Sequence, residues 1–379
     1  MLDQKKVFEI LAGQGITFFT GVPDSYLNGF CNYALANCPE RNIIAANEGN
    51  AVGIACGHYF ASREIPLVYM QNSGMGNTVN PLASLADENV YAVPMILLIG
   101  WRGQPGSGDW PQHKLQGEIT TGLLDVMGIP YSVLTDRIDE FEDVIRNAAE
   151  YCRGTRKPFA LIAPKGVMAG EKGNNKDDRY PLSREEAIEI IIDQMPKDTI
   201  YSATTGRATR ELFFLRERRG ETLRHDFLNV GSMGHASSVA LGIALERPDR
   251  QVVVLDGDSA AIMHMGAMTM ASKLDVPNYM HVVLNNGAHE SVGGQPSAGH
   301  LADLTKIAEG SGYRTVGYPV TDQEELVRAI ETLRNCGRAS FIDCRIHKGL
   351  KGALPPLKFS HREAIDELTE ELCGAKTDE

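Results

Sequence analysis

The stretch 252–290 constrains the fold more than any other part of the chain. It reads VVVLDGDSAAIMHMGAMTMASKLDVPNYMHVVLNNGAHE. An apolar run at 252–255 leads into the letters DGDS, and a second apolar run at 281–284 leads into NNG. Two short apolar runs separated by a helix-length segment predict a strand–helix–strand unit. The carboxyl ends of the two parallel strands then meet at one edge of a sheet, where open α/β folds bind their ligands.

The polar side chains expected at this edge suit a magnesium ion. Asp258 supplies a carboxylate, and Asn285 and Asn286 supply amide oxygens. Hard oxygen donors, few in number and without a cluster of His and Cys, are typical of Mg²⁺ that also binds phosphate oxygens. An isolated Asp-Gly-Asp is common in surface turns, so an ordinary strand–turn–helix unit is the alternative. That alternative leaves the two amides at the end of the second run unexplained.

Composition limits the partners that the chain can have. The 379 residues are 43% hydrophobic, which is enough for two α/β domains. A net charge of −12 disfavours a broad surface for nucleic acid or anionic membranes, although it allows a local cationic pocket for an anionic substrate. The chain has no apolar run of about 18 residues, and its start, MLDQKKVFEI, lacks a signal-peptide pattern. Seven cysteines without a C-x-x-C pair indicate reduced thiols, so we expect a cytoplasmic protein. The negative charge and the lack of a long apolar run lead us to expect no nucleic-acid or membrane partner.

Apolar runs and helix-length segments alternate through two halves of similar size. A first sheet is predicted from runs at 16–20, 42–45, 67–70, 95–99, 131–134 and 159–163. The second half has runs at 199–203, 227–230, 252–255, 281–284, 314–317 and 341–345. The polar, Gly-containing stretch 170–182 reads as a linker, and a capping box of Ser183 and Glu186 opens the helix after it. We therefore expect an α/β fold with two doubly wound parallel-sheet domains, 1–169 and 183–379.

Polar residues follow the predicted strands of the first half. Asp24 and Ser25 lie after the first strand, where they either cap the next helix or face a ligand. Glu48 opens the helix after the second strand, a position where an acidic residue is usually a surface residue favoured by the helix dipole. Asn72 lies after the third strand in a loop rich in Gly and amides, which can approach an anionic ligand closely.

A long segment at 100–113 follows the fourth strand and carries both tryptophans of the chain. Loops of this length are often lids or binding segments. Arg102 is a candidate to bind an acidic group, and His113 is a candidate to move a proton. A structured surface loop is the alternative for both residues.

The second half carries two further candidate loops. The turn Thr204-Thr205-Gly206 precedes a helix, so its hydroxyl and N–H groups are suited to bind a phosphate. Ser232 and Met233 lie in a second, Gly-containing loop, where packing into the core is the ordinary role of a Met.

Several of these segments resemble thiamine-diphosphate (ThDP)-dependent decarboxylases. Gly257-Asp258-Ser259, a spacer and Asn-Asn resemble the diphosphate-binding signature of that family, with Ser259 in place of the usual third glycine. Seven further segments resemble the phosphonopyruvate decarboxylase family: GVPDSYL, ANEGNAVGIACGHY, QNSGMGNTVNPLASL, GWRGQPG, TTGRATREL, GSMGHASSVALGIAL and HVVLNNGAHESVGGQP. The sulfopyruvate decarboxylases share several of them. The resemblance covers most of the chain.

The resemblance implies a fold and a reaction. Residues 1–169 would form the pyrimidine-binding domain and 183–379 the diphosphate- and Mg²⁺-binding domain, with no middle domain. The reaction would be the ThDP- and Mg²⁺-dependent decarboxylation of 3-phosphonopyruvate to phosphonoacetaldehyde and CO₂. Sulfopyruvate or another 3-substituted pyruvate is the alternative substrate. A non-catalytic ThDP-binding protein is a further alternative, which the presence of Glu48 disfavours.

The resemblance also implies how the cofactor would be held. Glu48 would bond to the aminopyrimidine and promote its imino form, which removes the proton from the thiazolium carbon. Mg²⁺ would be bound by Asp258, Asn286 and the carbonyl of Ala288. Asn285 is the alternative to Asn286, because the spacing is one residue longer than expected. Met233 would be the apolar wedge under the cofactor. The residues expected to contact ThDP are Glu48, Asn72, Thr204, Thr205, Gly206, Ser232, Met233, Gly257, Asp258, Ser259 and Asn286.

Proton transfer and substrate binding fall to a second set of residues. His113 or His289 would donate the proton that completes the reaction. Contacts to the anionic substrate are expected from Asp24, Ser25, Arg102, Lys114 and Arg207. In this family the pyrimidine-binding domain of one subunit faces the diphosphate-binding domain of another. The resemblance therefore implies a homo-oligomer, at least a dimer, with the active site between subunits.

Overall fold

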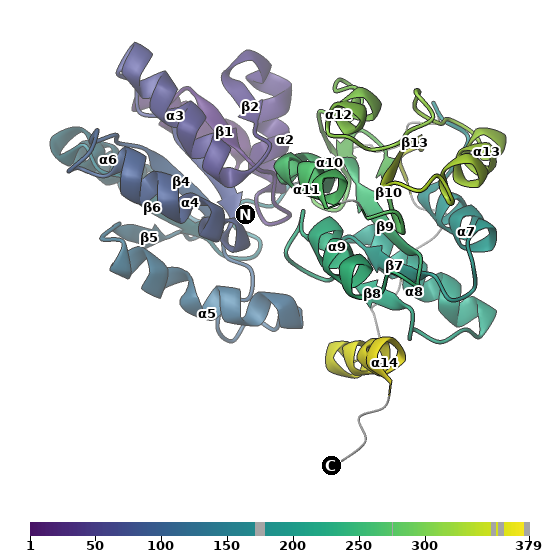
Figure 1. Ribbon diagram of the computed structural model, residues 1–379. Coiled ribbons are helices and arrows are strands. Elements are labelled where there is room, and N and C mark those ends of the chain that lie inside the picture. Colours follow the sequence, from purple (N-terminus) through teal and green to yellow (C-terminus); the bar gives the residue numbers. More distant parts are fainter. Residues whose placement is uncertain (171–178, 275, 350–353, 355–359, 375–379) are drawn as a thin grey trace. The chain divides into compact units, whose positions relative to one another are not determined.

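The computed structural model describes residues 1–379 except 171–178, 275, 350–353, 355–359 and 375–379. The chain divides into two compact units (Figure 1). The first consists of Met1–Asn174 and Ser291–Gln295, and the second of Asn175–Glu290 and Pro296–Glu379. Each contains a parallel sheet with helices on both faces, so the predicted fold class is confirmed. Most of the predicted linker 170–182 lies outside the described residues.

The sheet of the first unit has six strands in the order β2-β1-β3-β4-β6-β5, all parallel. They are β1 (Phe19–Gly21), β2 (Asn42–Ile44), β3 (Leu67–Gln71), β4 (Ile96–Gly100), β5 (Tyr131–Val133) and β6 (Phe159–Ala163). The helices are α1 (Gln4–Gly13), α2 (Asn28–Asn37), α3 (Glu48–Ser62), α4 (Met75–Pro81), α5 (Pro111–Val126) and α6 (Ile138–Thr155).

Side chains of one strand alternate between two hydrophobic clusters, as the two-residue repeat of a strand requires. In β3, Leu67 and Tyr69 pack with α1, α2 and α6. Val68 and Met70 pack on the other face with α3, α4 and α5. Both faces of the sheet are therefore covered, which is why its strands are apolar throughout.

The second unit has a five-stranded parallel sheet in the order β13-β10-β9-β7-β8. Its strands are β7 (Ile200–Ala203), β8 (Asp226–Leu228), β9 (Val252–Gly257), β10 (Tyr279–Asn285) and β13 (Ser340–Arg345). The two-residue strands β11 (Ala288–His289) and β12 (Gln295–Pro296) form a separate pair. The helices are α7 (Arg184–Gln194), α8 (Arg207–Arg219), α9 (Ala236–Glu246), α10 (Asp258–Met263), α11 (Met268–Lys273), α12 (Leu304–Gly310), α13 (Gln323–Leu333) and α14 (His361–Cys373).

Three local predictions can be compared directly with the structure. The capping box is present, because the Ser183 side chain accepts from the Glu186 N–H and the Glu186 side chain bonds back. The predicted loop 100–113 is shorter than expected, since Pro111 begins α5 and carries His113 into the helix. The predicted strand at 314–317 is wrong: a single bridge joins Arg314 to Ser340 there.

No helix among the described residues is both long and apolar enough to cross a membrane.

Candidate functional site

In each unit the strand order reverses beside the strand that comes first in the chain, between β1 and β3 and between β7 and β9. Doubly wound folds bind ligands in the crevice at the carboxyl ends of the two strands between which the order reverses. In the second unit Thr204 follows β7 and Asp258 follows β9, and the Thr204 N–H donates to the Leu255 carbonyl at 2.9 Å. In the first unit Asp24 follows β1, and Gln71 ends β3. Of the predicted site residues, Asp24, Thr204 and Asp258 therefore lie at these two places.

Glu48 is the first residue of α3 and is only 5% exposed, so the surface-residue interpretation does not hold. Asn47 caps the helix by accepting from the Asn50 N–H at 2.9 Å. Asn77 donates to Glu48 Oε2 at 2.7 Å, and a β-carbon on Gly74 would lie 2.2 Å from Glu48 Oε1. Burial raises the pKa of the Glu48 carboxyl, and the bond from Asn77 opposes that rise. The group is a buried carboxyl without a cationic partner among the described residues, a state suited to holding or sharing a proton.

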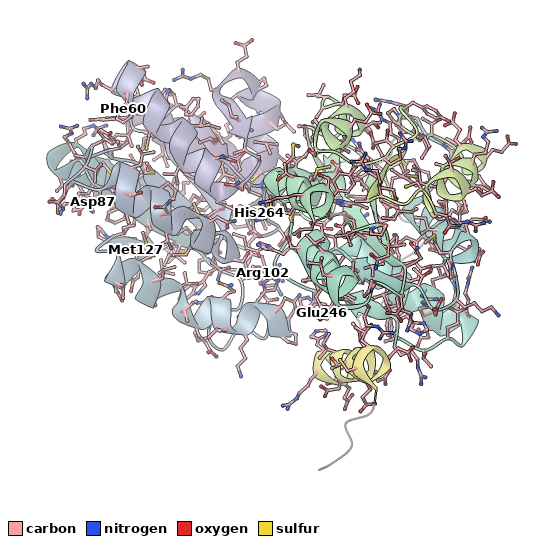
Figure 2. The ribbon with its side chains drawn as sticks, viewed as in Figure 1. Phe60, Asp87, Arg102, Met127, Glu246 and His264 are labelled. Atoms are coloured by element: carbon pink, nitrogen blue, oxygen red, sulfur yellow. The ribbon has the colours of Figure 1, made fainter. Side chains whose placement is uncertain are left out.

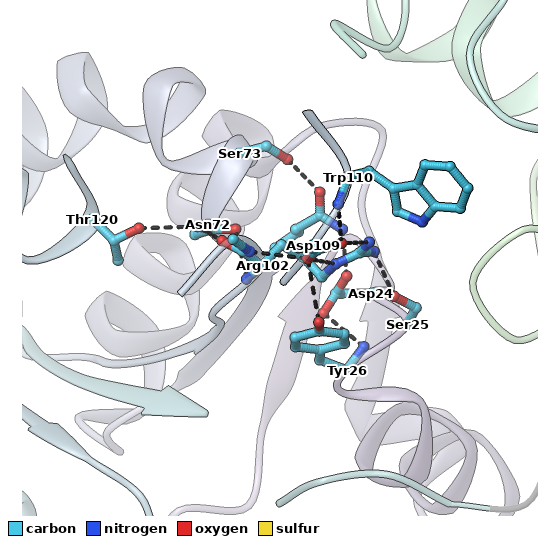
Figure 3. Close-up of polar contacts among 11 residues, drawn as sticks. Asp24, Ser25, Tyr26, Asn72, Ser73, Arg102, Asp109, Trp110 and Thr120 are labelled. Carbon is cyan, nitrogen blue, oxygen red and sulfur yellow. Dashed lines mark hydrogen bonds and ion pairs between the residues drawn. The ribbon is translucent and has the colours of Figure 1, made fainter. Parts of the chain in front are cut away.

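Arg102 lies just after β4 (Figure 2), and its side chain meets Asp109 of the same loop (Figure 3). Its Nε and Nη2 atoms donate to the two Asp109 oxygens at 2.6 and 2.7 Å. Its Nη1 donates to the Ser25 hydroxyl at 3.1 Å, and the guanidinium stacks over the Tyr26 ring, 4.8 Å from the centroid. The predicted substrate residues Arg102 and Ser25 are thus in direct contact.

Asp24 is fully buried at the carboxyl end of β1. It accepts from Gln71 Nε2 at 2.5 Å and from the Tyr26 N–H at 2.9 Å. Burial raises the pKa of its carboxyl, against the bonds from Gln71 and Tyr26 and the nearby Arg102. The following helix, α2, begins at Asn28 with no side-chain cap, so Asp24 does not cap it.

The Asn72 side chain is fully engaged within the first unit. Its Nδ2 donates to the Arg102 carbonyl at 2.8 Å and to the Thr120 hydroxyl at 2.9 Å. Its Oδ1 accepts from the Arg102 N–H at 3.2 Å. This side chain therefore holds the backbone of Arg102, and its contact with ThDP stays a prediction.

Asp258 begins α10 and is 2% exposed. Ser297 donates a hydrogen bond to its Oδ2. A β-carbon on Gly299 would lie 2.5 Å from Asp258 Oδ2 and 2.6 Å from Asn285 Oδ1, so these two oxygens face the same small space. Burial raises the pKa of Asp258 to about 6, against the bond from Ser297 and the N–H of Asn286. The Asn285 amide is thus the one whose side chain faces the same space as the carboxylate.

Asn286 turns toward Glu290 instead. Its Nδ2 donates to Glu290 Oε2 at 2.9 Å, and its Oδ1 accepts from the Ala288 N–H at 3.1 Å. Glu290 also pairs with Arg184 at 2.5 Å and with Arg207 at 2.7 Å. Arg207, predicted to bind substrate, is therefore neutralised inside the second unit.

The structure offers donors for a diphosphate. The hydroxyls of Thr204 and Ser259 are buried and have no hydrogen-bond partner among the described residues. Thr205 and Gly206 follow Thr204 in its turn and are half-buried, and Gly206 has φ 99°, a value that favours glycine. Unpaired buried hydroxyls are costly, so a ligand that accepts from them fits this place.

The oxygen donors also suit the predicted metal. No group of three or more His, Cys, Asp or Glu side chains able to hold a metal was found in the part of the chain that the structure describes. One carboxylate, amide oxygens and backbone carbonyls leave room for phosphate oxygens, the set that Mg²⁺ uses. This ligand set is available from Asp258, Asn285, Asn286 and Ala288, whose roles as Mg²⁺ ligands remain predictions.

The loop before α9 has an unusual backbone. Ser232 has φ 47° and is exposed, and Gly234 has φ 84°. Met233 between them is half-buried. A non-glycine residue in the left-handed region is uncommon and often marks a functional loop.

The two predicted proton donors are neutral near pH 7. His113 lies in the first turn of α5, where burial and Arg102 lower its pKa to about 4. Burial lowers the pKa of His289, in β11, to about 4 as well. Neither ring carries the second proton at neutral pH in this state, which disfavours an imidazolium donor. Lys114 is exposed near the start of α5.

Sequence reasoning missed the partners of the predicted residues. Asn77 bonds to Glu48, Asp109 pairs with Arg102, and Glu290 joins Asn286 to Arg184. Asn77 had a signal, since it lies in the amide-rich segment after the third strand. The ion pairs had no such signal, because Arg102 meets Asp109 only through the fold of their loop, and Arg184 meets Glu290 from 106 positions away.

Known protein families match both halves of the chain. The model "Thiamine pyrophosphate enzyme, N-terminal TPP binding domain" matches residues 4–127, and "Thiamine pyrophosphate enzyme, C-terminal TPP binding domain" matches residues 205–344. Phosphonopyruvate decarboxylase of Streptomyces viridochromogenes is 33% identical over 338 residues, 85% of this chain and 83% of that protein. Its counterpart in Streptomyces hygroscopicus is 32% identical over 83% of this chain and 80% of that protein.

A third relative is sulfopyruvate decarboxylase of Methanosarcina acetivorans. It is 28% identical over 395 residues, which cover 97% of each chain. Further matches are named as the alpha and beta subunits of sulfopyruvate decarboxylase.

Proposed function

The chain belongs to the family of ThDP-dependent enzymes that contains the phosphonopyruvate decarboxylases, and we propose that it decarboxylates 3-phosphonopyruvate to phosphonoacetaldehyde and CO₂. When bound, ThDP supplies the nucleophilic carbon and the electron sink for this reaction. The observation that carries the proposal is the Glu48 carboxyl, which is buried at the start of α3 with a raised pKa.

Each group of residues has a part in this proposal. Glu48 bonds to the aminopyrimidine, and its raised pKa lets it share a proton there. Asp258, with the side chain of Asn285 or Asn286 and the Ala288 carbonyl, binds Mg²⁺. The set Thr204, Thr205, Gly206, Gly257 and Ser259 binds the diphosphate, and Asn72, Ser232 and Met233 line the cofactor.

The substrate would be held mainly by Arg102. Guanidinium groups bind phosphonate and carboxylate oxygens in pairs of parallel hydrogen bonds. Asp24 and Ser25 lie beside it, and exposed Lys114 adds positive charge near the start of α5. Arg207 is the other cationic candidate, and Glu290 pairs with it as Asp109 pairs with Arg102.

His113 and His289 keep their proposed part in proton transfer, but a neutral ring would relay a proton, taking one up on its free nitrogen as it gives one up from the other. We further propose that 1–169 binds the pyrimidine and 183–379 the diphosphate, joined by the linker 170–182. A cytoplasmic location fits the seven cysteines, all of them free.

Substrate choice is tested by CO₂ release from purified protein with ThDP and Mg²⁺. We expect phosphonopyruvate to give kcat/KM at least about tenfold above sulfopyruvate and about a hundredfold above pyruvate, because the phosphonate carries one more negative charge than the sulfonate and pyruvate lacks this anion. Preference for sulfopyruvate would favour the alternative, which the similarity to the Methanosarcina acetivorans enzyme supports. No CO₂ from any of the three acids would contradict the proposed function.

The assembly is a second expectation. We propose a homo-oligomer, at least a dimer, in which the pyrimidine-binding domain of one subunit meets the diphosphate-binding domain of another. Light scattering on the active protein should then give a mass of at least twice 41.4 kDa. An active sample with the mass of one chain would contradict the shared active site.

A further inference from the structure

We propose that Asp109 is a positioning residue that fixes the Arg102 guanidinium for the phosphonate group of the substrate. The inference rests on the proposed function for the identity of the anion. It assigns Asp109 a part in substrate recognition, although this side chain itself would not touch the substrate. The argument starts from the hydrogen bonds of the two side chains (Figure 3).

The Asp109 carboxylate binds one edge of the Arg102 guanidinium. Its two oxygens accept from Nε and Nη2, and Ser25 accepts from Nη1. An arginine side chain has five N–H donors in a rigid plane. Described residues use three of them, which leaves one N–H on each terminal nitrogen of Arg102. Each can still be donated in the guanidinium plane, and a phosphonate has oxygens enough to accept both.

Asp109 is itself held in place from several sides. It accepts from the Gly103 N–H at 2.9 Å, from its neighbour Trp110 at 2.8 Å and from the Tyr26 hydroxyl at 3.2 Å. Although burial raises the pKa of the Asp109 carboxyl, the bonds from Arg102, Trp110 and Gly103 hold it well below its usual range. Asp109 is therefore a charged acceptor at neutral pH, and five hydrogen bonds hold it in place.

The loop backbone supports the same arrangement. Gly103 has φ 67°, and a β-carbon there would lie 1.9 Å from the His113 carbonyl oxygen. A β-carbon on Gly117 would lie 1.7 Å from the Gly103 carbonyl oxygen. Only glycine permits this close contact between the loop and α5. Asn72 adds two bonds to the backbone of Arg102, so both members of the pair are fixed.

The same contacts allow a different interpretation, in which Asp109 occupies the place of the substrate anion and must leave first. The geometry disfavours it. An anion that displaced Asp109 would have to replace five accepted hydrogen bonds, three of which come from groups other than Arg102. Binding through the two remaining N–H groups breaks none of them. The two interpretations predict opposite effects of neutralising Asp109.

The chain carries its own probe for this pair. Trp101 precedes Arg102, Trp110 follows Asp109, and these are the two tryptophans of the sequence. Intrinsic tryptophan fluorescence therefore reports this segment, without any signal from elsewhere in the chain. A second pair of the same geometry serves as control, because Arg247 also holds Asp249 through Nε and Nη2, at 2.9 and 2.7 Å.

The test is a fluorescence titration of the full chain, with Mg²⁺ and ThDP present, with methylphosphonate as an unreactive phosphonate. We expect saturable binding to the parent protein and a Kd at least about tenfold higher in Asp109→Asn, because the amide loses the charge that orients the guanidinium. Asp249→Asn should leave Kd within about twofold. Asp109→Glu, which keeps the charge but moves the oxygens, should also raise Kd and serves if Asp109→Asn does not fold.

Different results would contradict the role of Asp109 and the proposed decarboxylase function. An unchanged Kd in Asp109→Asn, or no saturable binding to the parent protein, would overturn the role of Asp109. A lower Kd would overturn it in favour of competition. Equal weakening in Asp249→Asn would also overturn it, since the effect would then be general. The proposed function fails on different evidence, namely phosphonate binding without release of CO₂ from any 2-oxo acid.

Discussion

Glu48→Gln is expected to lower kcat by at least about a hundredfold while ThDP and Mg²⁺ remain bound. The amide has nearly the same shape, so the packing against Gly74 is preserved. It cannot take up or release a proton, and a general acid–base group typically contributes about 10²–10⁴ in rate. The Glu48 carboxyl suits proton transfer because the residue is only 5% exposed and burial raises its pKa.

Two measurements check this expectation. The rate of CO₂ release from phosphonopyruvate gives kcat, and calorimetric titration with ThDP gives the cofactor affinity. Glu118→Gln is the matched control, because Glu118 is exposed in the same unit and should leave both values unchanged. Turnover in Glu48→Gln within about fivefold of the parent would remove Glu48 from the mechanism. Loss of ThDP binding would show that Glu48 is needed to bind the cofactor, and the fall in kcat would then say nothing about proton transfer.

The positions of the candidate residues were predictable because parallel sheets obey simple rules. Apolar runs marked the strands, and polar residues directly after them had to lie at the carboxyl edge. Glu48 and Asp258 were located in this way, and the structure places them at the first residues of α3 and α10. The strand at 159–163 was predicted to the residue.

The contacts of these residues were not predictable from local patterns. By its position alone Glu48 fitted a surface residue, and only the packing of α3 shows that it is buried. Arg102 and Asp109 lie seven positions apart, but their pairing depends on left-handed backbone at Gly103, Gly106 and Gly108. Arg184 lies 106 positions from Glu290, so no pattern in the sequence could join them. Sequence patterns specify which edge a residue reaches, whereas its partners follow from the packing of distant segments.

Glu290 is a residue whose loss should cost the second unit several kcal/mol of stability. The residue is 6% exposed, and its carboxylate accepts from four groups: Arg184, Arg207, Asn286 and the Gly349 N–H. Removing one member of a buried ion pair leaves an uncompensated charge, which typically costs about 3–5 kcal/mol. Arg184 would keep only Glu211 among the described acidic groups.

Glu290→Ala should therefore lower the free energy of unfolding of the second unit by about 3–5 kcal/mol, measured by urea denaturation. Glu290→Gln should cost less, because the amide still accepts from the arginines. Asp193→Ala is the matched control: Asp193 pairs with Arg219 at 2.7 Å but is 54% exposed, so its loss should cost below about 1 kcal/mol.

A second effect would separate positioning from stability. Because Asn286 Nδ2 loses its acceptor in Glu290→Ala, the affinity for Mg²⁺ and ThDP should also fall, by about tenfold, at urea concentrations where the protein is still folded. Equal stability losses in Glu290→Ala and Asp193→Ala would mean that the buried network contributes no more than a surface pair. If Glu290→Ala is destabilised but keeps full cofactor affinity, Glu290 contributes to stability alone and does not position Asn286.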